Sequence, residues 1–218
     1  MKVLLNKLHF PVTTLGFGRR VGIWFQGCSI RCPGCISHDT WEAGAEHEIP
    51  LEDVMAALAP WLAHADGVTI SGGEPFDQPE ALFELVGAIR RGFAGDVLAY
   101  SGHSFDRLEE EHSGILGRLD VLISEPYRLR EAQTRWLRGS DNQRLHLLSA
   151  LGRERYGDRA DAQAWPRQRR LDLMEQNGEL WLAGIPAPGM LGQLEGALAA
   201  RGHRVAQTSQ QAVLPVRA

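Results

Sequence analysis

All three cysteines of this 218-residue chain lie within eight positions, in the segment GCSIRCPGC. Cys28, Cys32 and Cys35 have the spacing Cys-x3-Cys-x2-Cys, and the proline and glycine between the last two allow the loop to wrap closely around its contents. In a reducing compartment, clustered thiols bind metal or do redox chemistry more often than they form structural disulfides. The cysteines therefore predict a metal centre.

Two kinds of metal centre fit these three thiols. They can hold three irons of a cubane [4Fe-4S] cluster, whose full complement is four cysteines, so that one iron is left without a protein ligand. An open metal position is typical of catalytic sites, by analogy with zinc. In the alternative, His38 completes a structural Cys3His zinc site. The cysteines alone leave both alternatives open.

A second motif, ISGGEP at 70–75, lies at the end of a predicted strand. Gly72 and Gly73 would let backbone groups approach a ligand closely, and Glu74 can accept a hydrogen bond from an ammonium group. Because a structural zinc site has no use for such a turn, the motif favours the cluster.

Strand and helix patterns alternate along the first 126 residues. We expect strands at 19–27, 67–75, 96–102 and 120–126, and helices at 50–65, 78–92 and 104–118. This order predicts a parallel sheet, either open or curved toward a partial barrel, and ligands bind at the carboxyl ends of such strands. The cysteine loop, SGGEP, YSGH and SEPY each follow a strand, so we expect them to meet at one edge.

The pattern changes after residue 150. We interpret 152–168 as a linker, 169–184 as a hairpin around Asn177 and Gly178, 188–202 as a helix and 203–209 as a strand. The chain is thus expected to consist of a core at 1–150 and, at 151–218, a linker with a small ββαβ unit.

Composition narrows the class of protein. A net charge of -4 argues against a general nucleic-acid binder, and no apolar stretch is long enough to cross a bilayer, so we expect a cytoplasmic protein without a membrane partner. Residues 128–170 hold 11 arginines, no lysine and five acidic residues. We interpret this segment as a solvated face, with a docking patch for an acidic partner or for phosphates as the alternative.

Taken together, the two motifs resemble those of the radical S-adenosylmethionine superfamily. Within it, the chain is most similar to the activating proteins of anaerobic ribonucleotide reductase, in the glycyl-radical-enzyme activase group. The segments GCSIRCPGC with the following TW, then SGGEP, YSGHSFDRL, DVLI and WLRGSDNQRLH occur in the expected order over roughly residues 9–148. The resemblance implies an α/β fold, a partial (β/α) barrel with mostly parallel strands, here with a C-terminal hairpin and helix added.

The resemblance also implies roles for individual residues, none of them a catalytic side chain. The implied ligands of the [4Fe-4S] cluster are Cys28, Cys32 and Cys35, and S-adenosylmethionine chelates the fourth iron. The implied cofactor-binding residues are Gly72, Gly73, Glu74 and Pro75 at the methionyl group, Ser101, Gly102 and His103 beside Tyr100 at the nucleoside, and Arg138 and Asn142. For the last two and Gln143, shaping the site edge, contacting the partner and capping the sheet remain alternatives.

The implied reaction is reductive cleavage of S-adenosylmethionine to a 5′-deoxyadenosyl radical, with a glycine of a partner protein as the leading target. The implied electron donor is a low-potential flavodoxin or ferredoxin. After the third cysteine, this chain has Ile36 and Ser37 where the family usually has an aromatic residue and Asn. After the last strand it has SEPY where the family usually has Asp-Gly before a basic-aromatic pair. Some 70 residues follow the last motif, whereas the family's reductase activators tend to end soon after it. These departures leave open an enzyme acting on a small molecule or peptide, like 7-carboxy-7-deazaguanine synthase, or a non-catalytic zinc or cluster scaffold.

Overall fold

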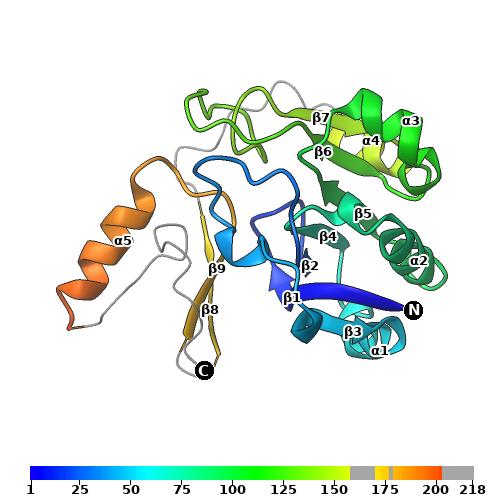
Figure 1. Ribbon diagram of the computed structural model, residues 1–218, viewed down its shortest axis with the longest axis horizontal. Coiled ribbons are helices and arrows are strands. Elements are labelled where there is room, and N and C mark those ends of the chain that lie inside the picture. The colour runs from blue at the N-terminus through cyan, green and yellow to red at the C-terminus, as the bar shows by residue number, and fades with distance from the viewer. Residues whose placement is uncertain (158–169, 177–178, 203–218) are drawn as a thin grey trace.

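A seven-stranded sheet forms the centre of the computed structural model, which describes residues 1–157, 170–176 and 179–202 (Figure 1). Its order is β3-β1-β2-β4-β5-β6-β7. The strands are β1 (Lys2–Val12), β2 (Arg20–Phe25), β3 (Glu48–Pro50), β4 (Gly67–Gly72), β5 (Asp96–Tyr100), β6 (Val121–Ser124) and β7 (Arg144–Leu147), and β8 (Asp172–Gln176) pairs with β9 (Glu179–Ala183) in a separate hairpin. The helices are α1 (Leu51–Leu62), α2 (Pro79–Arg90), α3 (Phe105–Leu116), α4 (Ala150–Tyr156) and α5 (Met190–Ala199), with short 3-10 turns η1 (His38–Thr40), η2 (Ala45–His47) and η3 (Pro75–Asp77).

The four middle strands, β2, β4, β5 and β6, run parallel to one another, whereas β1, β3 and β7 pair antiparallel at the two sides. The expected α/β fold with a mostly parallel central sheet is confirmed. Within the described residues β3 and β7 do not pair with each other, so the sheet is open and no closed barrel forms. The carboxyl ends of the parallel strands lie along one edge, where the predicted motifs emerge.

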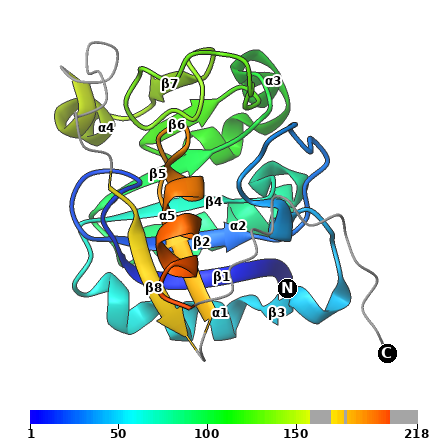
Figure 2. The ribbon, with the colours of Figure 1, turned by 90° about the vertical axis from the view of Figure 1, so that its left-hand side faces the viewer.

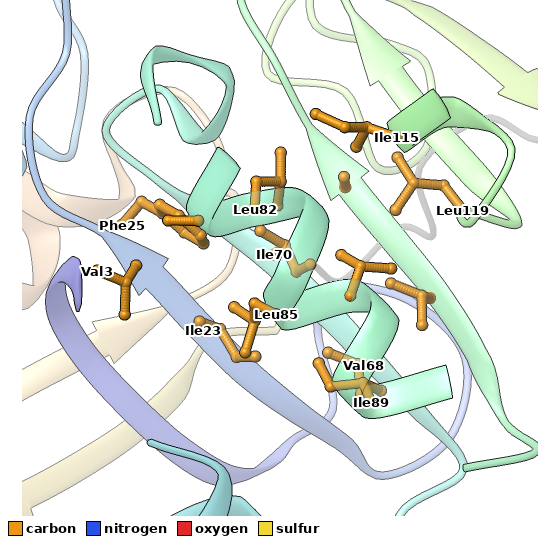
Figure 3. Close-up of a cluster of buried hydrophobic side chains, with 14 of the residues drawn as sticks. Val3, Ile23, Phe25, Val68, Ile70, Leu82, Leu85, Ile89, Ile115 and Leu119 are labelled. Atoms are coloured by element: carbon orange, nitrogen blue, oxygen red, sulfur yellow. The ribbon is translucent and has the colours of Figure 1, made fainter. Parts of the chain in front are cut away.

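Helices α1, α2 and α3 cover one face of this sheet. Ile23 and Ile70 point from the strands toward Leu82, Leu85 and Ile89, which recur at helical spacing along α2 (Figure 3). All five side chains are almost completely buried, so this layer is the main hydrophobic core. It fixes β2 and β4, the two strands that carry the cysteine loop and the SGGEP turn.

The β8–β9 hairpin packs on the opposite face (Figures 1 and 2). Trp181 of β9 meets Trp24 of β2 edge to face, with 4.4 Å between the ring centroids. At the end of the hairpin, the Asp172 carboxylate accepts hydrogen bonds from the hydroxyl groups of Thr13 and Thr14, at 2.7 and 3.0 Å. The hairpin therefore covers part of the other face of the sheet, over β1 and β2.

Most of the expected elements are present, with four differences. The strands β1, β3 and β7 were not expected, and the linker expected from residue 152 is wrong at its start, because 150–156 form α4 and Tyr156 is completely buried. The hairpin is confirmed, whereas its turn at 177–178, the strand at 203–209 and most of the linker lie outside the described residues. The division of the chain at residue 150 stays a prediction. No helix in the described part of the chain is long and apolar enough to span a membrane.

Candidate functional site

The cysteine loop begins directly after β2 and is closed at its base by backbone hydrogen bonds. The N–H groups of Gly27 and Cys28 donate to the carbonyls of Thr40 and Trp41, at 2.8 and 3.0 Å, and so hold the two ends of the loop together. Gly27 has a φ of +94°, a conformation that favours glycine. The TW pair of the sequence motif, at the end of η1, thus closes the base of the loop.

The three thiols of this loop are free and partly buried. Burial raises the pKa of each thiol, and the nearby Cys28 and Cys32 raise the pKa of Cys35 further. The thiols therefore lie close enough to affect one another's charge. A metal centre bound there would offset the cost of ionising the buried thiols, because it stabilises the thiolates.

The SGGEP turn is bonded directly to the cysteine loop. The N–H groups of Gly73 and Glu74 donate to the carbonyls of Phe25 and Gly27, both at 2.9 Å. A Cβ on Gly73 would lie 2.0 Å from the Gly27 carbonyl oxygen, and Gly72 has a φ of +109°. The sequence predicts that these glycines let a ligand approach, and the structure adds that they let the two loops approach each other.

Glu74 is the buried centre of this edge, with 1% of its surface exposed. Its carboxylate accepts hydrogen bonds from the Phe76 N–H at 3.0 Å, the Ser101 hydroxyl at 2.9 Å and the Gly102 N–H at 2.7 Å. Burial raises the pKa of Glu74 to about 7 despite these three donors. The carboxylate joins the SGGEP turn to the YSGH turn, and no cation is among the partners that bond to it in the described chain.

The YSGH turn brings His103 next to the cysteine loop through Asp77. His103 Nε2 lies 3.7 Å from Oδ1 of Asp77. The two oxygens of this carboxylate accept hydrogen bonds from Ser29, Oδ2 from the N–H at 2.7 Å and Oδ1 from the hydroxyl at 2.8 Å. Burial and the adjacent Arg107 lower the pKa of His103, whereas Asp77 raises it. Asp77 was not among the predicted site residues, although it follows the SGGEP motif by two positions.

The RGSDNQ segment bonds to the turn after β6. Asn142 donates to the Pro126 carbonyl at 2.9 Å and Gln143 donates to the Glu125 carbonyl at 3.1 Å. The next residue in that turn, Tyr127, directs its backbone N–H to the Cys32 thiol, whose pKa it lowers. Asn142 therefore reaches the cysteine loop through a supporting turn.

Arg138, the other predicted residue of this segment, is 1% exposed, and its charge acts on the Tyr100 hydroxyl. That hydroxyl donates to the Leu137 carbonyl at 3.1 Å. The structure thus brings the predicted residues of the SGGEP and YSGH turns together beside the cysteine loop, and places Arg138 near Tyr100.

The donor set fits a [4Fe-4S] cluster better than a single zinc ion. Within the described residues, no three side chains of His, Cys, Asp or Glu surround one point where a metal ion could be held. His38, the predicted fourth zinc ligand, instead packs its ring against Trp41, with 3.8 Å between centroids. A cubane cluster binds each thiolate to a different iron, so its three cysteines need not converge on one point.

Comparison with known proteins agrees with this choice. The model of a family described as "4Fe-4S single cluster domain" matches residues 14–146. The chain is 30% identical over 135 residues to the anaerobic ribonucleoside-triphosphate reductase-activating protein of Enterobacteria phage T4, covering 60% of this chain and 85% of that protein. It is 31% identical over 129 residues to the pyruvate formate-lyase-activating enzyme of Clostridium pasteurianum, covering 56% of this chain and about half of that enzyme, 52%.

Among solved structures, the crystal structure of QueE from Escherichia coli matches 47% of this chain and 53% of its own chain. The sequence identity is 21% and the TM-score is 0.40.

Proposed function

Because this chain belongs to the 4Fe-4S single cluster domain family, and within it to the activases of glycyl-radical enzymes, we propose that it generates a glycyl radical on a partner protein. The cofactors of this family are an iron–sulfur cluster and S-adenosylmethionine. The curated relatives act, by their names, on anaerobic ribonucleoside-triphosphate reductase and on pyruvate formate-lyase. A partner of the same class is the substrate that we propose here.

One observation carries the proposal: three turns from three parallel strands are hydrogen-bonded into a single unit. The SGGEP turn bonds to the cysteine loop through Gly73 and Glu74, and to the YSGH turn through the Glu74 carboxylate. A cluster and a ligand bound to its open iron need such neighbouring loops, because the ligand must reach both at once. A cluster with only a structural role would need the cysteine loop alone.

The residues of this unit have separate tasks in the proposed reaction. Cys28, Cys32 and Cys35 would hold three irons and leave the fourth to S-adenosylmethionine. When bound, the cluster supplies one electron to the sulfonium, and cleavage of the carbon–sulfur bond gives the 5′-deoxyadenosyl radical. Glu74 places a buried carboxyl group next to this loop, and the methionyl ammonium would provide the positive charge that favours its ionised form.

The proposed setting follows from the same chemistry. Three thiols that must stay reduced to bind iron suit the cytoplasm, where glutathione and thioredoxin keep thiols reduced. A low-potential flavodoxin or ferredoxin is the proposed electron donor. No nucleic-acid partner is part of the proposal.

Anaerobic reconstitution with iron and sulfide tests the cofactor chemistry. The purified protein should take up four irons per chain as expected for one cubane, and release 5′-deoxyadenosine when dithionite and S-adenosylmethionine are added. Cys32→Ala should abolish this release, because one iron loses its ligand. Ile36→Ser, a change beside the third cysteine that leaves all three thiols in place, is the matched control and should retain it.

Electron paramagnetic resonance tests the partner. After incubation with the anaerobic ribonucleotide reductase of the same organism, we expect a glycyl-radical doublet on the reductase and none with Cys32→Ala. Release of 5′-deoxyadenosine without a doublet on any glycyl-radical enzyme of that organism would contradict the proposed substrate. A protein that binds zinc and shows no visible iron–sulfur absorbance would contradict the proposed cofactor.

A further inference from the structure

Two apolar side chains are exposed next to the tip of the cysteine loop. Leu129 is 61% exposed and Ile36 is 40% exposed. Leu129 contacts the loop directly, because a Cβ on Gly34 would lie 2.8 Å from its Cδ1 atom. Pro33 and Gly34, which form the tip, are themselves exposed. The cysteine loop thus reaches the surface beside an apolar patch.

Two arginines lie beside Leu129. Arg128 and Arg130 flank Leu129 in the sequence and are exposed, and Glu131 is the one acidic residue between 128 and 135. Arg128 lies 3.8 Å from Glu131 in an exposed and therefore weak ion pair, and Arg130 forms no hydrogen bond or ion pair within the described part of the chain. In a chain with a net charge of -4, this is a local positive surface.

We propose that Ile36 and residues 128–130, here named the cluster-loop patch, are the docking site of an acidic low-potential protein that donates one electron. The inference rests on the proposed function, in which the cluster must be reduced. One electron leaves the reduced flavin or iron–sulfur centre of the donor, which is oxidised, and the [4Fe-4S]2+ cluster gains it and becomes [4Fe-4S]+. No atom is transferred.

The place and size of the patch favour the donor over the glycine-bearing partner. The cysteine loop contacts the patch through Gly34. It contacts the cofactor turns through two other residues: Ser29 bonds to Asp77, and Ile30 lies next to Gly102. A protein on the patch would therefore approach the cysteines without covering the S-adenosylmethionine turns. A small apolar centre with a charged rim also suits a transient electron-transfer complex, which buries less surface than a stable one.

Charge reversal at the rim tests this inference with two different reductants. In anaerobic stopped-flow experiments at low salt, we expect Arg130→Glu, and more strongly the double variant with Arg128→Glu, to slow reduction by reduced flavodoxin on the order of ten-fold. Reduction by dithionite, a small molecule that needs no docking site, should stay within about two-fold. Arg91→Glu is the control, because this exposed arginine follows α2 at the amino-terminal end of the sheet.

The outcomes separate the two proposals. If flavodoxin reduces the double variant as fast as the wild type, the docking site is overturned. It is also overturned if dithionite reduces the wild-type protein but flavodoxin and ferredoxin do not. If the double variant is reduced normally by flavodoxin but no longer forms the glycyl radical, the patch binds the radical-bearing partner, and its assignment to the electron donor is overturned. Failure of the proposed function would appear independently, as wild-type protein that is reduced by dithionite yet releases no 5′-deoxyadenosine.

Discussion

The parallel strands bury carboxylates near both ends, and two of these, Asp96 and Glu74, have opposite surroundings. Asp96, at the start of β5, is fully buried between Arg20 at 2.6 Å and Arg155 at 2.7 Å, and it accepts a hydrogen bond from the Tyr156 hydroxyl at 3.1 Å. Glu74, after the end of β4, is as deeply buried, but its donors are two backbone N–H groups and one hydroxyl. One end of the sheet supplies its own countercharges and the other does not.

This difference separates a structural end from a functional end. At the amino end, the cations belong to the chain, so the charges are balanced in the folded protein itself. At the carboxyl end, the positive charge is left to a ligand, which agrees with the general position of ligands in parallel sheets. A buried carboxylate without a cation costs stability, and such a cost is typical of sites that bind a charged partner.

Removing the charge at the amino end should have the largest effect on stability. Asp96→Asn leaves the Arg20 guanidinium, which is completely buried, without its carboxylate partner. We expect the free energy of unfolding to fall by about 3–5 kcal/mol, measured by urea denaturation under anaerobic conditions. Asp106→Asn, an exposed change in the first turn of α3, is the control and should cost less than about 1 kcal/mol. Equal losses in both variants would contradict the structural role of this end.

At the carboxyl end, the corresponding effect is a pH dependence of opposite sign to that of an ion-paired carboxylate. The pKa of Glu74 is raised from 4.5 to about 7, so the folded protein keeps a proton that the unfolded chain loses. Stability from this group is therefore present below about pH 4.5 and lost as the pH rises to about 7. The loss amounts to about 3 kcal/mol, at about 1.4 kcal/mol for each pKa unit.

Comparison with Glu74→Gln isolates this group, because the other titrating groups are common to both proteins. Urea denaturation of the cluster-free proteins at pH 5 and pH 8 should show a larger loss in the wild type than in the variant. If both proteins lose the same amount, Glu74 does not carry the uncompensated charge. In the reconstituted protein, S-adenosylmethionine should then stabilise the wild type more than the variant, because its ammonium would complete the pair.

The sequence predicted those helices and strands in which apolar residues recur at regular spacing. The apolar residues of α2 recur at helical spacing, and the strands between the helices are short apolar runs, so the parallel core could be derived. Strand β1 gave no such pattern, because its pairing with β2 shifts twice, between Leu5 and Lys7 and between His9 and Val12. Helix α4 is seven residues long and rich in charge, and its buried Tyr156 packs against residues far away in the sequence.

The site was predictable as a set of motifs but not as a set of contacts. Cysteine spacing and the order of the turns gave the residues that meet at the carboxyl edge. The contact of Glu74 with Ser101 spans 27 positions, and that of Arg20 with Asp96 spans 76. Whether a buried charge has a partner depends on such distant pairs, so the difference between Glu74 and Asp96 appears only in the fold.

The last and smallest expected effect concerns the support of the cysteine loop at the same carboxyl edge. Gln143 is 9% exposed, accepts from the Gly139 N–H at 2.7 Å and donates to the Glu125 carbonyl. Together with Asn142 it fixes the turn whose Tyr127 N–H faces Cys32. Gln143→Ala and Asn142→Ala should each lower the free energy of unfolding by about 1–2 kcal/mol, because one partner of a buried hydrogen bond is lost.

The same two variants decide between support of the loop and direct binding of the cofactor. If Asn142 and Gln143 act through the turn, a chelator should remove iron faster from both variants, whereas their affinity for S-adenosylmethionine, measured before iron is lost, should change little. Arg144→Ala is the matched control, since this exposed neighbour forms no side-chain bond with the described part of the chain. Weaker binding of S-adenosylmethionine with normal iron retention would instead place Asn142 at the cofactor. In that case the carboxyl end would contain two groups that bind the ligand, Glu74 and Asn142. It would then differ from the amino end, where the buried charges are balanced within the chain, even more than the contacts of Glu74 alone indicate.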